Sequence, residues 1–327
     1  MSAPESAKPE PSLPFRVGPY LLQRLVGRGR TGFVYDAVNA ETGQRTAIKL
    51  MHAGEGSALG TSTEVALFAR EALVLAQMPP HPNIVRVLTA GVADQKPFIA
   101  MEFVDGVPMS EWMSRLRPGS AASVRLLRDV ALAIHHAHEG GVIHRDLNPL
   151  HILVGRGGRP CVTAFAHARS LTADQRAMSS AGGTVVAVPA YMSPELAQGQ
   201  KADRRSDVYS LGAMLYEMLA GQPPFTGHQP VATLLRVIQD PVPPLPPAVD
   251  APGRAVQAAC LKALAKDPAE RFPTAKDFAD ALTAGLETRA DPGTSPSSSR
   301  GVRWALGVGA ALAAAGLLYL LVRLLKG

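Results

Sequence analysis

Three glycines interrupt an alternating apolar stretch and limit what this part of the chain can form. Residues 25–38 read LVGRGRTGFVYDAV, with Gly27, Gly29 and Gly32 at the breaks. Glycine permits a tight turn between strands and lets backbone N–H groups approach phosphate oxygens without a Cβ in the way. A dinucleotide-binding βαβ unit would need a helix next, but a second strand pattern follows. The stretch therefore predicts a phosphate-binding strand–turn–strand, with a plain hairpin turn as the alternative.

A third strand and a helix follow the glycines. The string TAIKL places Lys49 on the third strand, and STEVALFAREALVLAQM then has helical apolar spacing. A glutamate on that helix can pair with Lys49 and direct its ammonium group at phosphates. Glu71, in the turn that leads into HPNIV, is the predicted partner, and Glu64 is the alternative.

These features belong to a longer series of strings in fixed order. Over roughly residues 17–284 the chain resembles the eukaryotic-like Ser/Thr protein kinases of bacteria. The resemblance implies an α+β, bilobal protein-kinase-like fold over residues 17–286, with a small β-rich lobe, a larger helical lobe and nucleotide between them. The matching strings are GRGRTGFVY, TAIK, HPNIV, PFIAMEFVDG, VIHRDLNPLHILV, PAYMSPE, DVYSLG and KDPAERFPTAKDFA.

The resemblance also implies which side chains would face ATP. Met101 would be the gatekeeper, and Glu102 to Val104 the hinge that faces adenine. The apolar side chains that would sandwich the base are Val34, Ala47 and Leu153. A spine that ties the two lobes together would consist of Leu75, His144 and Phe165.

The catalytic-loop string HRDLNPLH keeps one reactive residue of the family and changes two. Asp146, which by resemblance would accept the proton of the substrate hydroxyl, is present. Asn148 stands where the family has a lysine near the γ-phosphate, and His151 where it has a metal-binding asparagine. An imidazole nitrogen is poorly suited to Mg²⁺, a hard ion that prefers oxygen ligands.

The string that corresponds to the family's DFG is changed as well. It reads Ala164-Phe165-Ala166, so a methyl group replaces the carboxylate that would hold magnesium. We therefore predict no metal ligands in this chain and poor binding of Mg²⁺. Phosphoryl transfer depends on positioning and on charge neutralisation by the metal, which these changes would weaken. Lys49 and the glycines are retained, and they are compatible with weak ATP binding.

The activation segment is altered, whereas the scaffold residues are kept. The four apolar residues Val185–Val188 separate Gly183-Thr184 from PAYMSPE, and they should displace the ledge that receives a substrate peptide. A tolerated loop insertion is the alternative. The retained scaffold residues are Glu195 and Arg271, which can pair, and Asp207, which would support the catalytic loop.

Loss of the reactive groups with retention of the architecture indicates a pseudokinase. Such a protein would act by binding, as a scaffold or allosteric partner of an active kinase or another signalling protein. One alternative is an active Ser/Thr kinase with atypical metal use, which Asp146, Lys49 and Glu71 support. A second alternative is an interaction module that binds no nucleotide, its cleft covered by Val185–Val188.

The carboxy-terminal part has the pattern of a membrane anchor. Residues 304–322 read WALGVGAALAAAGLLYLLV, which contains no charged residue and would span about 28 Å as a helix. We predict a single-pass helix in the cell membrane, with the kinase-like domain in the cytoplasm. Small residues at positions 305, 309 and 313 are compatible with a homodimer. The flanking segments are a disordered tail over 1–14, a Ser/Pro-rich linker over 288–303 and a short tail over 323–327.

Composition excludes two other classes of function. The formal net charge is +6, but the basic residues are scattered and aromatic residues make up 5%, so nucleic acid is not an expected partner. The chain has two cysteines, too few for a disulfide framework or a cysteine-built zinc site. His135 and His138 share a helix face, but a structural or surface role is favoured over a metal site.

Overall fold

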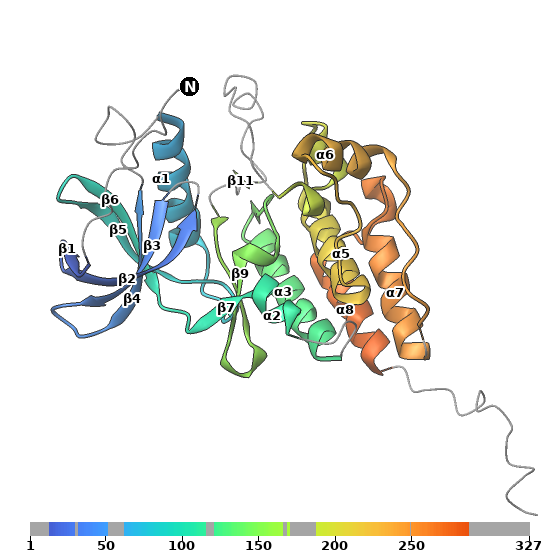
Figure 1. Ribbon diagram of the computed structural model, residues 1–327, viewed down its shortest axis with the longest axis horizontal. Helices are drawn as coiled ribbons and strands as arrows, with labels where there is room; N and C mark the ends of the chain where they lie inside the picture. Colours follow the sequence, from blue (N-terminus) through green and yellow to red (C-terminus); the bar gives the residue numbers. More distant parts are fainter. Residues whose placement is uncertain are drawn as a thin grey trace, which may run out of the picture. The chain divides into compact units, whose positions relative to one another are not determined.

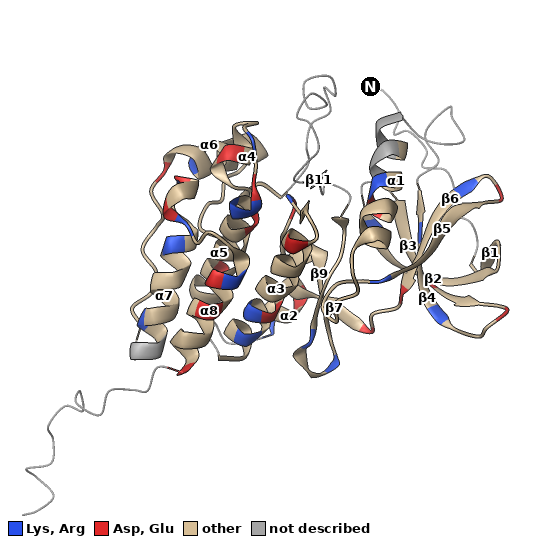
Figure 2. Ribbon diagram, turned by 180° about the vertical axis from the view of Figure 1, so that it is seen from behind, with Lys and Arg blue, Asp and Glu red and all other residues tan. Residues whose placement is uncertain are grey.

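The computed structural model describes residues 13–29, 32–51, 62–115, 121–165, 169–170, 188–248 and 250–287. Within these residues the chain forms an α+β fold of two lobes, which confirms the expected fold class (Figure 1). Basic and acidic residues are interspersed over both lobes (Figure 2).

The small lobe is an antiparallel sheet with one helix, α1 (Ser62–Gln77), beside it (Figure 1). The strand order is β1-β2-β3-β4-β6-β5, so the strands of the glycine-rich stretch and the strand of Lys49 are direct neighbours. The strands are β1 (Phe15–Val17), β2 (Tyr20–Gly29), β3 (Gly32–Asn39), β4 (Arg45–Met51), β5 (Val87–Ala93) and β6 (Lys96–Glu102).

The expected strand–turn–strand is formed by β2 and β3, which pair from Tyr20 to Gly29 with register shifts between Leu22 and Arg24 and between Leu25 and Gly27. Gly32 opens β3 against β4, where a Cβ would lie 2.0 Å from the carbonyl oxygen of Leu50. A contact that short with backbone cannot be relieved by a side-chain movement, so only glycine fits at this position.

The large lobe is mainly helical and begins with short strands under the small lobe. Its helices pack side by side, with α5 between α3 and α7 (Figure 1). The helices are α2 (Met109–Ser114), α3 (Ala121–Glu139), α4 (Pro194–Ala197), α5 (Arg204–Ala220), α6 (Pro230–Gln239), α7 (Ala251–Ala263) and α8 (Ala275–Glu287). The strands are β7 (Gly106–Pro108), β8 (Val142–Ile143), β9 (Ile152–Gly155), β10 (Pro160–Val162) and β11 (Arg169–Ser170).

Helix α5 is the centre of the large lobe. Its residues from Ser206 to Tyr216 are all buried, so it lacks the exposed polar face of a surface helix. The Asp203 side chain accepts the backbone N–H of Arg205 and caps the start of the helix, and Gly221 ends it with a φ of 80°. A helix buried on all sides gives its polar side chains fixed positions, and Asp207 is one of them.

Several predicted segments lie outside the described residues. These are most of the amino-terminal tail, the apolar insertion up to Ala187, the linker over 288–303 and the predicted membrane helix over 304–322. Among the helices that the structure describes, none is both long enough and apolar enough to cross a bilayer.

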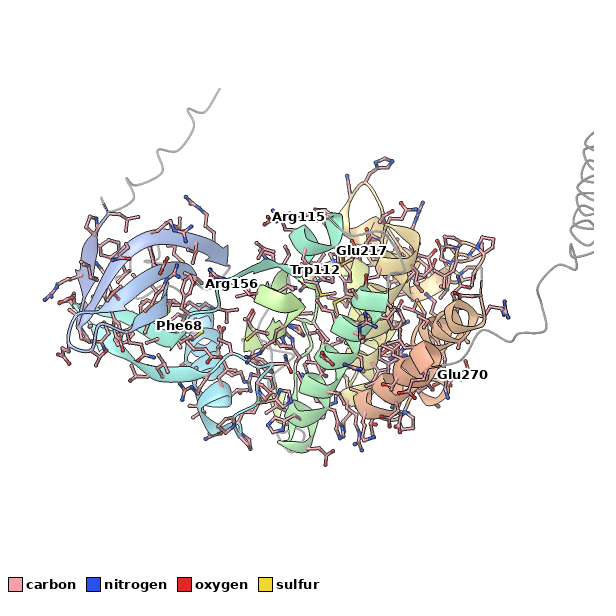
Figure 3. The ribbon with its side chains drawn as sticks, turned by 90° about the horizontal axis from the view of Figure 1, so that it is seen from below. Phe68, Trp112, Arg115, Arg156, Glu217 and Glu270 are labelled. Carbon is pink, nitrogen blue, oxygen red and sulfur yellow. The ribbon has the colours of Figure 1, made fainter. Side chains whose placement is uncertain are left out.

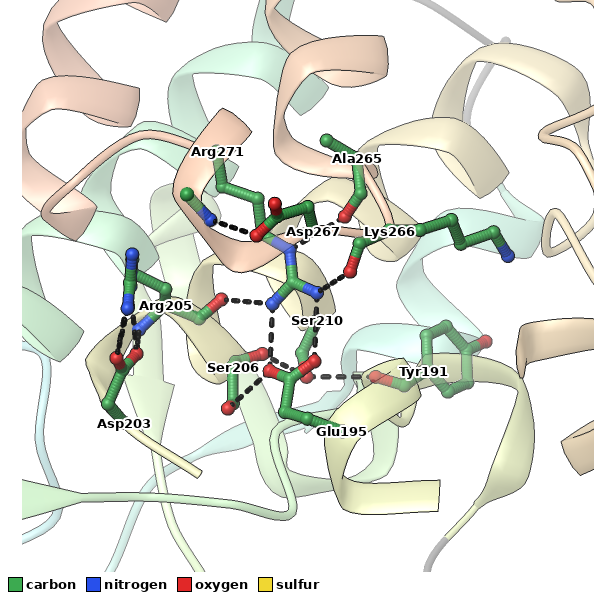
Figure 4. A network of polar contacts seen from close by, with 11 residues as sticks. Tyr191, Glu195, Asp203, Arg205, Ser206, Ser210, Ala265, Lys266, Asp267 and Arg271 are labelled. Atoms are coloured by element: carbon green, nitrogen blue, oxygen red, sulfur yellow. Dashed lines mark hydrogen bonds and ion pairs between the residues drawn. The ribbon is translucent and has the colours of Figure 1, made fainter. Parts of the chain in front are cut away.

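A buried ion pair joins the segment after the catalytic cleft to the end of the large lobe (Figure 4). The guanidinium of Arg271 donates to both carboxylate oxygens of Glu195, each at 2.8 Å. Burial opposes the charged form of Glu195, but the hydrogen bonds and charge of Arg271 outweigh it and lower the pKa. The remaining donors of Arg271 bind the backbone carbonyls of Arg205, Ala265 and Lys266.

Replacing Arg271 should therefore destabilise the whole large lobe. We expect Arg271→Ala to lower the free energy of unfolding by about 3–5 kcal/mol, because Glu195 would be left buried and unpaired. Urea unfolding measures the change. Arg254→Ala, at an exposed position on α7, is the control and should stay within about 0.5 kcal/mol of the wild type. Equal effects of the two substitutions would contradict the role given to this pair.

Candidate functional site: the cleft between the lobes

The structure pairs Lys49 with Glu71. Lys49 lies on β4 and Glu71 on α1, and their side chains form an ion pair between Nζ and Oε2. Both residues are buried, with 7% and 2% of their surface exposed. Phe68, labelled in Figure 3 in the small lobe, has its ring centroid 5.9 Å from the same ammonium group. The side chain of Glu64, the alternative partner, lies outside the described residues.

The residues expected to face adenine come from neighbouring strands of both lobes. In the small lobe, Ala47 on β4 is the register partner of Met101 on β6, and Val34 on β3 is the partner of Lys49. Glu102 ends β6, and Val104 follows it. Leu153 lies on β9 of the large lobe, and its register partner is Pro108 on β7. These positions are compatible with a base between the lobes, and contact with a nucleotide stays a prediction.

The two large-lobe members of the expected spine are in contact. The ring of Phe165 is 4.7 Å from that of His144, and both residues are fully buried. Leu75 of α1 belongs to the same hydrophobic core as Phe165. Burial is the main reason that the pKa of His144 falls to about 4, so its imidazole is neutral near pH 7. Its Nε2 lies 3.0 Å from the carbonyl oxygen of Thr163.

Asp207 on α5 fixes the start of the catalytic loop. Its two carboxylate oxygens accept the backbone N–H groups of His144 and Arg145, each at 2.9 Å. His138 Nε2 lies 2.7 Å from the same carboxylate. Burial opposes the charge of Asp207, but His138 and the other partners outweigh it and lower the pKa.

Two histidines of α3, His136 and His138, have structural partners. His138 is held by Asp207, and His136 Nε2 lies 2.9 Å from the carbonyl oxygen of Pro79. In the part of the chain that the structure describes, no three His, Cys, Asp or Glu side chains are grouped as metal ligands. A structural role is thus supported for His138 and His136, and the role of His135 stays a prediction.

Asn148 closes the catalytic loop instead of extending toward a phosphate. Its Oδ1 accepts the backbone N–H of Leu150 at 3.0 Å and caps the short 3₁₀ helix η1 (Pro149–His151). Its Nδ2 donates to Asp146, to the carbonyl oxygen at 2.9 Å and to Oδ1 at 3.2 Å. Only 1% of Asn148 is exposed. Sequence reasoning missed this role, although asparagine followed by proline is a common helix start.

His151 is turned onto the same loop. Its Nδ1 lies 2.6 Å from the carbonyl oxygen of Asp146 and 3.6 Å from the carboxylate Oδ2. The same Nδ1 lies 3.0 Å from Nδ2 of Asn148, so atoms of the catalytic loop surround this nitrogen. The side chain is 26% exposed, and Nε2 is its remaining nitrogen. The position of the family's asparagine ligand thus presents no oxygen.

Ala164 shows the same loss at the second ligand position. Its φ is 62°, in the left-handed region that asparagine and aspartate enter more readily than alanine. The backbone thus adopts a conformation that suits an aspartate, but the side chain is a methyl group. Neither Ala164 nor His151 gives Mg²⁺ the oxygen ligand it prefers, so these residues do not fit the ion.

A small hollow lies beside Asp146 where a substrate peptide would approach. Its walls include Leu147 of the catalytic loop and Tyr191, whose hydroxyl donates to Glu217 at 2.6 Å. Val188, the last residue of the apolar insertion, also lines it and packs against the main core. The insertion therefore ends against the catalytic loop.

The sequence pattern of the protein kinase domain matches residues 20–281. The chain belongs to the protein kinase family. A protein kinase domain implies ATP binding, and this one is of the bacterial eukaryotic-like Ser/Thr type.

Three curated relatives illustrate the similarity. The probable Ser/Thr protein kinase PknB of Bifidobacterium longum is 36% identical over 280 residues, which cover 81% of this chain and 39% of the relative. Pkn1 of Myxococcus xanthus is 34% identical over 87% of this chain and 40% of its own length. PknJ of Mycobacterium tuberculosis is 36% identical over 85% and 47%. The chain thus spans less than half the length of these kinases.

Solved structures support the fold. The kinase domain of Mycobacterium tuberculosis PknI, in a single-substitution mutant, superimposes with a TM-score of 0.59. The match covers 84% of this chain and 99% of the PknI domain at 24% identity, so it speaks for the architecture alone.

The neutral His144 should make the kinase domain less stable in acid. Its pKa of about 4 lies below the 6.5 of an exposed histidine, so only the unfolded chain binds this proton between those values. Stability is therefore lost as the pH falls from about 6.5 to 4, by on the order of 3 kcal/mol from this group. In that pH range we expect the unfolding free energy of His144→Phe to change less steeply with pH than that of the wild type. The difference in slope corresponds to at most about one bound proton.

Urea unfolding of both proteins across the pH range checks this expectation. The difference between their slopes gives the contribution of His144 together with its effect on Asp207, whose pKa it helps to lower. Parallel curves for wild type and His144→Phe would show that His144 does not titrate as described.

Proposed function

We propose that this chain is a pseudokinase: a Ser/Thr protein kinase-like protein that works by binding and transfers phosphate very slowly or not at all. One observation carries the proposal. At both positions where the family holds magnesium, the side chain offers no oxygen, since Ala164 has a methyl group and His151 has an imidazole, whose Nδ1 lies 2.6 Å from the carbonyl oxygen of Asp146. Without the ion, the charge that develops on the transferred phosphoryl group lacks the metal that neutralises most of it in the family.

The side chains around Asp146 support the same conclusion. In the family, this aspartate accepts a proton from the substrate hydroxyl. Here its Oδ1 accepts from the Asn148 amide, and His151 Nδ1 lies 3.6 Å from Oδ2. The Asn148 amide thus occupies one of the two carboxylate oxygens that would receive the proton. The positive charge of the family's lysine is also missing at Asn148.

In this proposal the protein still binds nucleotide. Lys49 is already oriented by Glu71, and the β2–β3 hairpin is formed, so a phosphate chain could be bound without a metal. We propose weak binding of ATP or ADP with little dependence on magnesium, through Lys49 and the backbone at Gly27, Gly29 and Gly32.

An active kinase with atypical metal use is the second candidate. The assembled ion pair of Lys49 with Glu71 and the contact of Phe165 with His144 favour it, because both resemble an intact cleft. Positioning alone can accelerate a reaction, so slow transfer could persist.

We further propose a place and a partner for this protein. Residues 304–322 would anchor it in the cell membrane with the kinase domain in the cytoplasm, and their small-residue spacing is compatible with a homodimer. The partner would be an active kinase or another signalling protein, regulated through contact.

Phosphoryl transfer is the decisive measurement. We expect the purified chain, incubated with labelled ATP and magnesium or manganese, to incorporate no more phosphate than its Lys49→Met variant. Lys96→Met, on the exposed start of β6, is the matched control. Turnover that Lys49→Met abolishes and Lys96→Met leaves intact would establish the active-kinase alternative instead.

Nucleotide binding is tested separately by thermal shift. ATP should raise the melting temperature of the wild type equally with and without magnesium, and it should not stabilise Lys49→Met. A shift that requires magnesium would contradict the metal argument. No shift at any ATP concentration would favour the module that binds no nucleotide.

Restoring the lost groups tests whether they are the cause of inactivity. Ala164→Asp, His151→Asn and Asn148→Lys together should raise phosphate incorporation at least about 100-fold, because they return both oxygen ligands and one positive charge. A triple variant with Ala164→Gly in place of the aspartate is the control, since glycine accepts the left-handed backbone but supplies no oxygen. Equal rates for the two triple variants would contradict the explanation.

A further inference from the structure

A proline-rich run connects α6 with α7 in the large lobe. Residues 241–248 read PVPPLPPA and form neither helix nor strand. The run follows α7 on the outside of the large lobe, from the end of α6 to the beginning of α7 (Figure 1). Within it, the prolines at positions 241, 243, 244, 246 and 247 are all exposed.

Burial along this run repeats every three residues. Val242, Leu245 and Ala248 are half-buried, and Val242 and Leu245 pack against the main hydrophobic core. A period of three is that of the polyproline II helix, in which every third side chain lies on the same edge. The pattern therefore places one edge of such a helix on the protein and two edges in solvent.

The two outward edges consist almost entirely of proline. One carries Pro241, Pro244 and Pro247, and the other carries Pro243 and Pro246 after Asp240. The consecutive pairs 243–244 and 246–247 thus expose proline rings on both edges at two successive turns. This PxxP spacing is the chemistry read by grooves lined with aromatic side chains.

The run is held in place before any partner arrives. Its inward edge is packed on the core, and the Gln257 side chain donates to the carbonyl oxygen of Pro246. A free proline-rich peptide must be ordered on binding, whereas an anchored one has already lost that freedom.

Charge at the ends of the run defines the partner further. Asp240 precedes it and Asp250 follows it, and both are exposed. A complementary groove would carry basic side chains beside its aromatic ones.

From this geometry we infer that residues 240–248 are a docking ligand for a protein with an aromatic-lined, polyproline-binding groove flanked by basic residues. The interaction uses a surface away from the nucleotide cleft and does not depend on phosphoryl transfer. It gives the chain a contact through which an inactive domain can recruit a partner.

Binding to known polyproline readers tests this inference. The full-length chain, purified in detergent, is titrated with recombinant SH3, WW and EVH1 domains while the fluorescence of their groove tryptophans is followed. We expect saturable binding to at least one domain, strongest for the groove with the most basic border and weaker at high salt. Pro243→Ala with Pro246→Ala should reduce the affinity at least about tenfold.

Matched variants separate recognition from folding. Pro80→Ala with Pro230→Ala changes two exposed prolines outside the run and should leave binding unchanged. Asp240→Asn should weaken binding about threefold and reduce its salt dependence. The melting temperature of the Pro243/Pro246 variant should stay within about 2 °C of the wild type, because both rings are exposed.

Two results would overturn the inference. One is the absence of saturable binding to all three domains. The other is binding that the Pro243/Pro246 substitutions leave unchanged, which would place the contact elsewhere. Neither result bears on the pseudokinase proposal, whose test is phosphate incorporation.

Discussion

The carboxylate of Asp207, buried in the middle of α5, determines where the cleft of this domain lies. It accepts two backbone N–H groups at the start of the catalytic loop and also binds His138. A buried charge is tolerated only when it is fully hydrogen-bonded, so the loop has one low-energy position. His144 then lies under Phe165, and Asp146 faces the cleft. Helix α5 can supply this anchor because the ion pair of Arg271 with Glu195 holds its surroundings.

The chemistry of the cleft has been replaced without disturbing that anchor. Asn148 donates to the carbonyl oxygen of Asp146, and Nδ1 of His151 lies 2.6 Å from the same oxygen. These contacts hold the loop in place without a lysine and without a metal. Uncompensated loss would have left buried polar groups without partners, which is costly. Asn148 and His151 thus have a structural role of their own in the loop. This pattern differs from damage at random, and it is consistent with a domain retained for binding.

Sequence reasoning predicted the parts of the structure that depend on local pattern. The glycine hairpin, the strand of Lys49 and the helix of Glu71 follow from spacing, and a likeness to known kinases ordered them into two lobes. The orientation of side chains did not follow. A pattern could say that His151 is a poor ligand, but only the fold shows its Nδ1 directed at a backbone carbonyl. The outward edges of the proline run likewise depend on tertiary packing, whereas the cap made by Asn148 is local and was missed although asparagine precedes proline there.

The left-handed backbone at Ala164 has a consequence for how this protein can change over generations. Alanine and aspartate codons can differ in a single base, and so can those for histidine and asparagine and those for asparagine and lysine. The main chain at position 164 already has a shape that suits the acidic residue. The present sequence and one with the family's three residues restored are therefore close neighbours in mutational distance. Under the pseudokinase proposal, few base changes separate this domain from one that carries the family's full set of reactive groups.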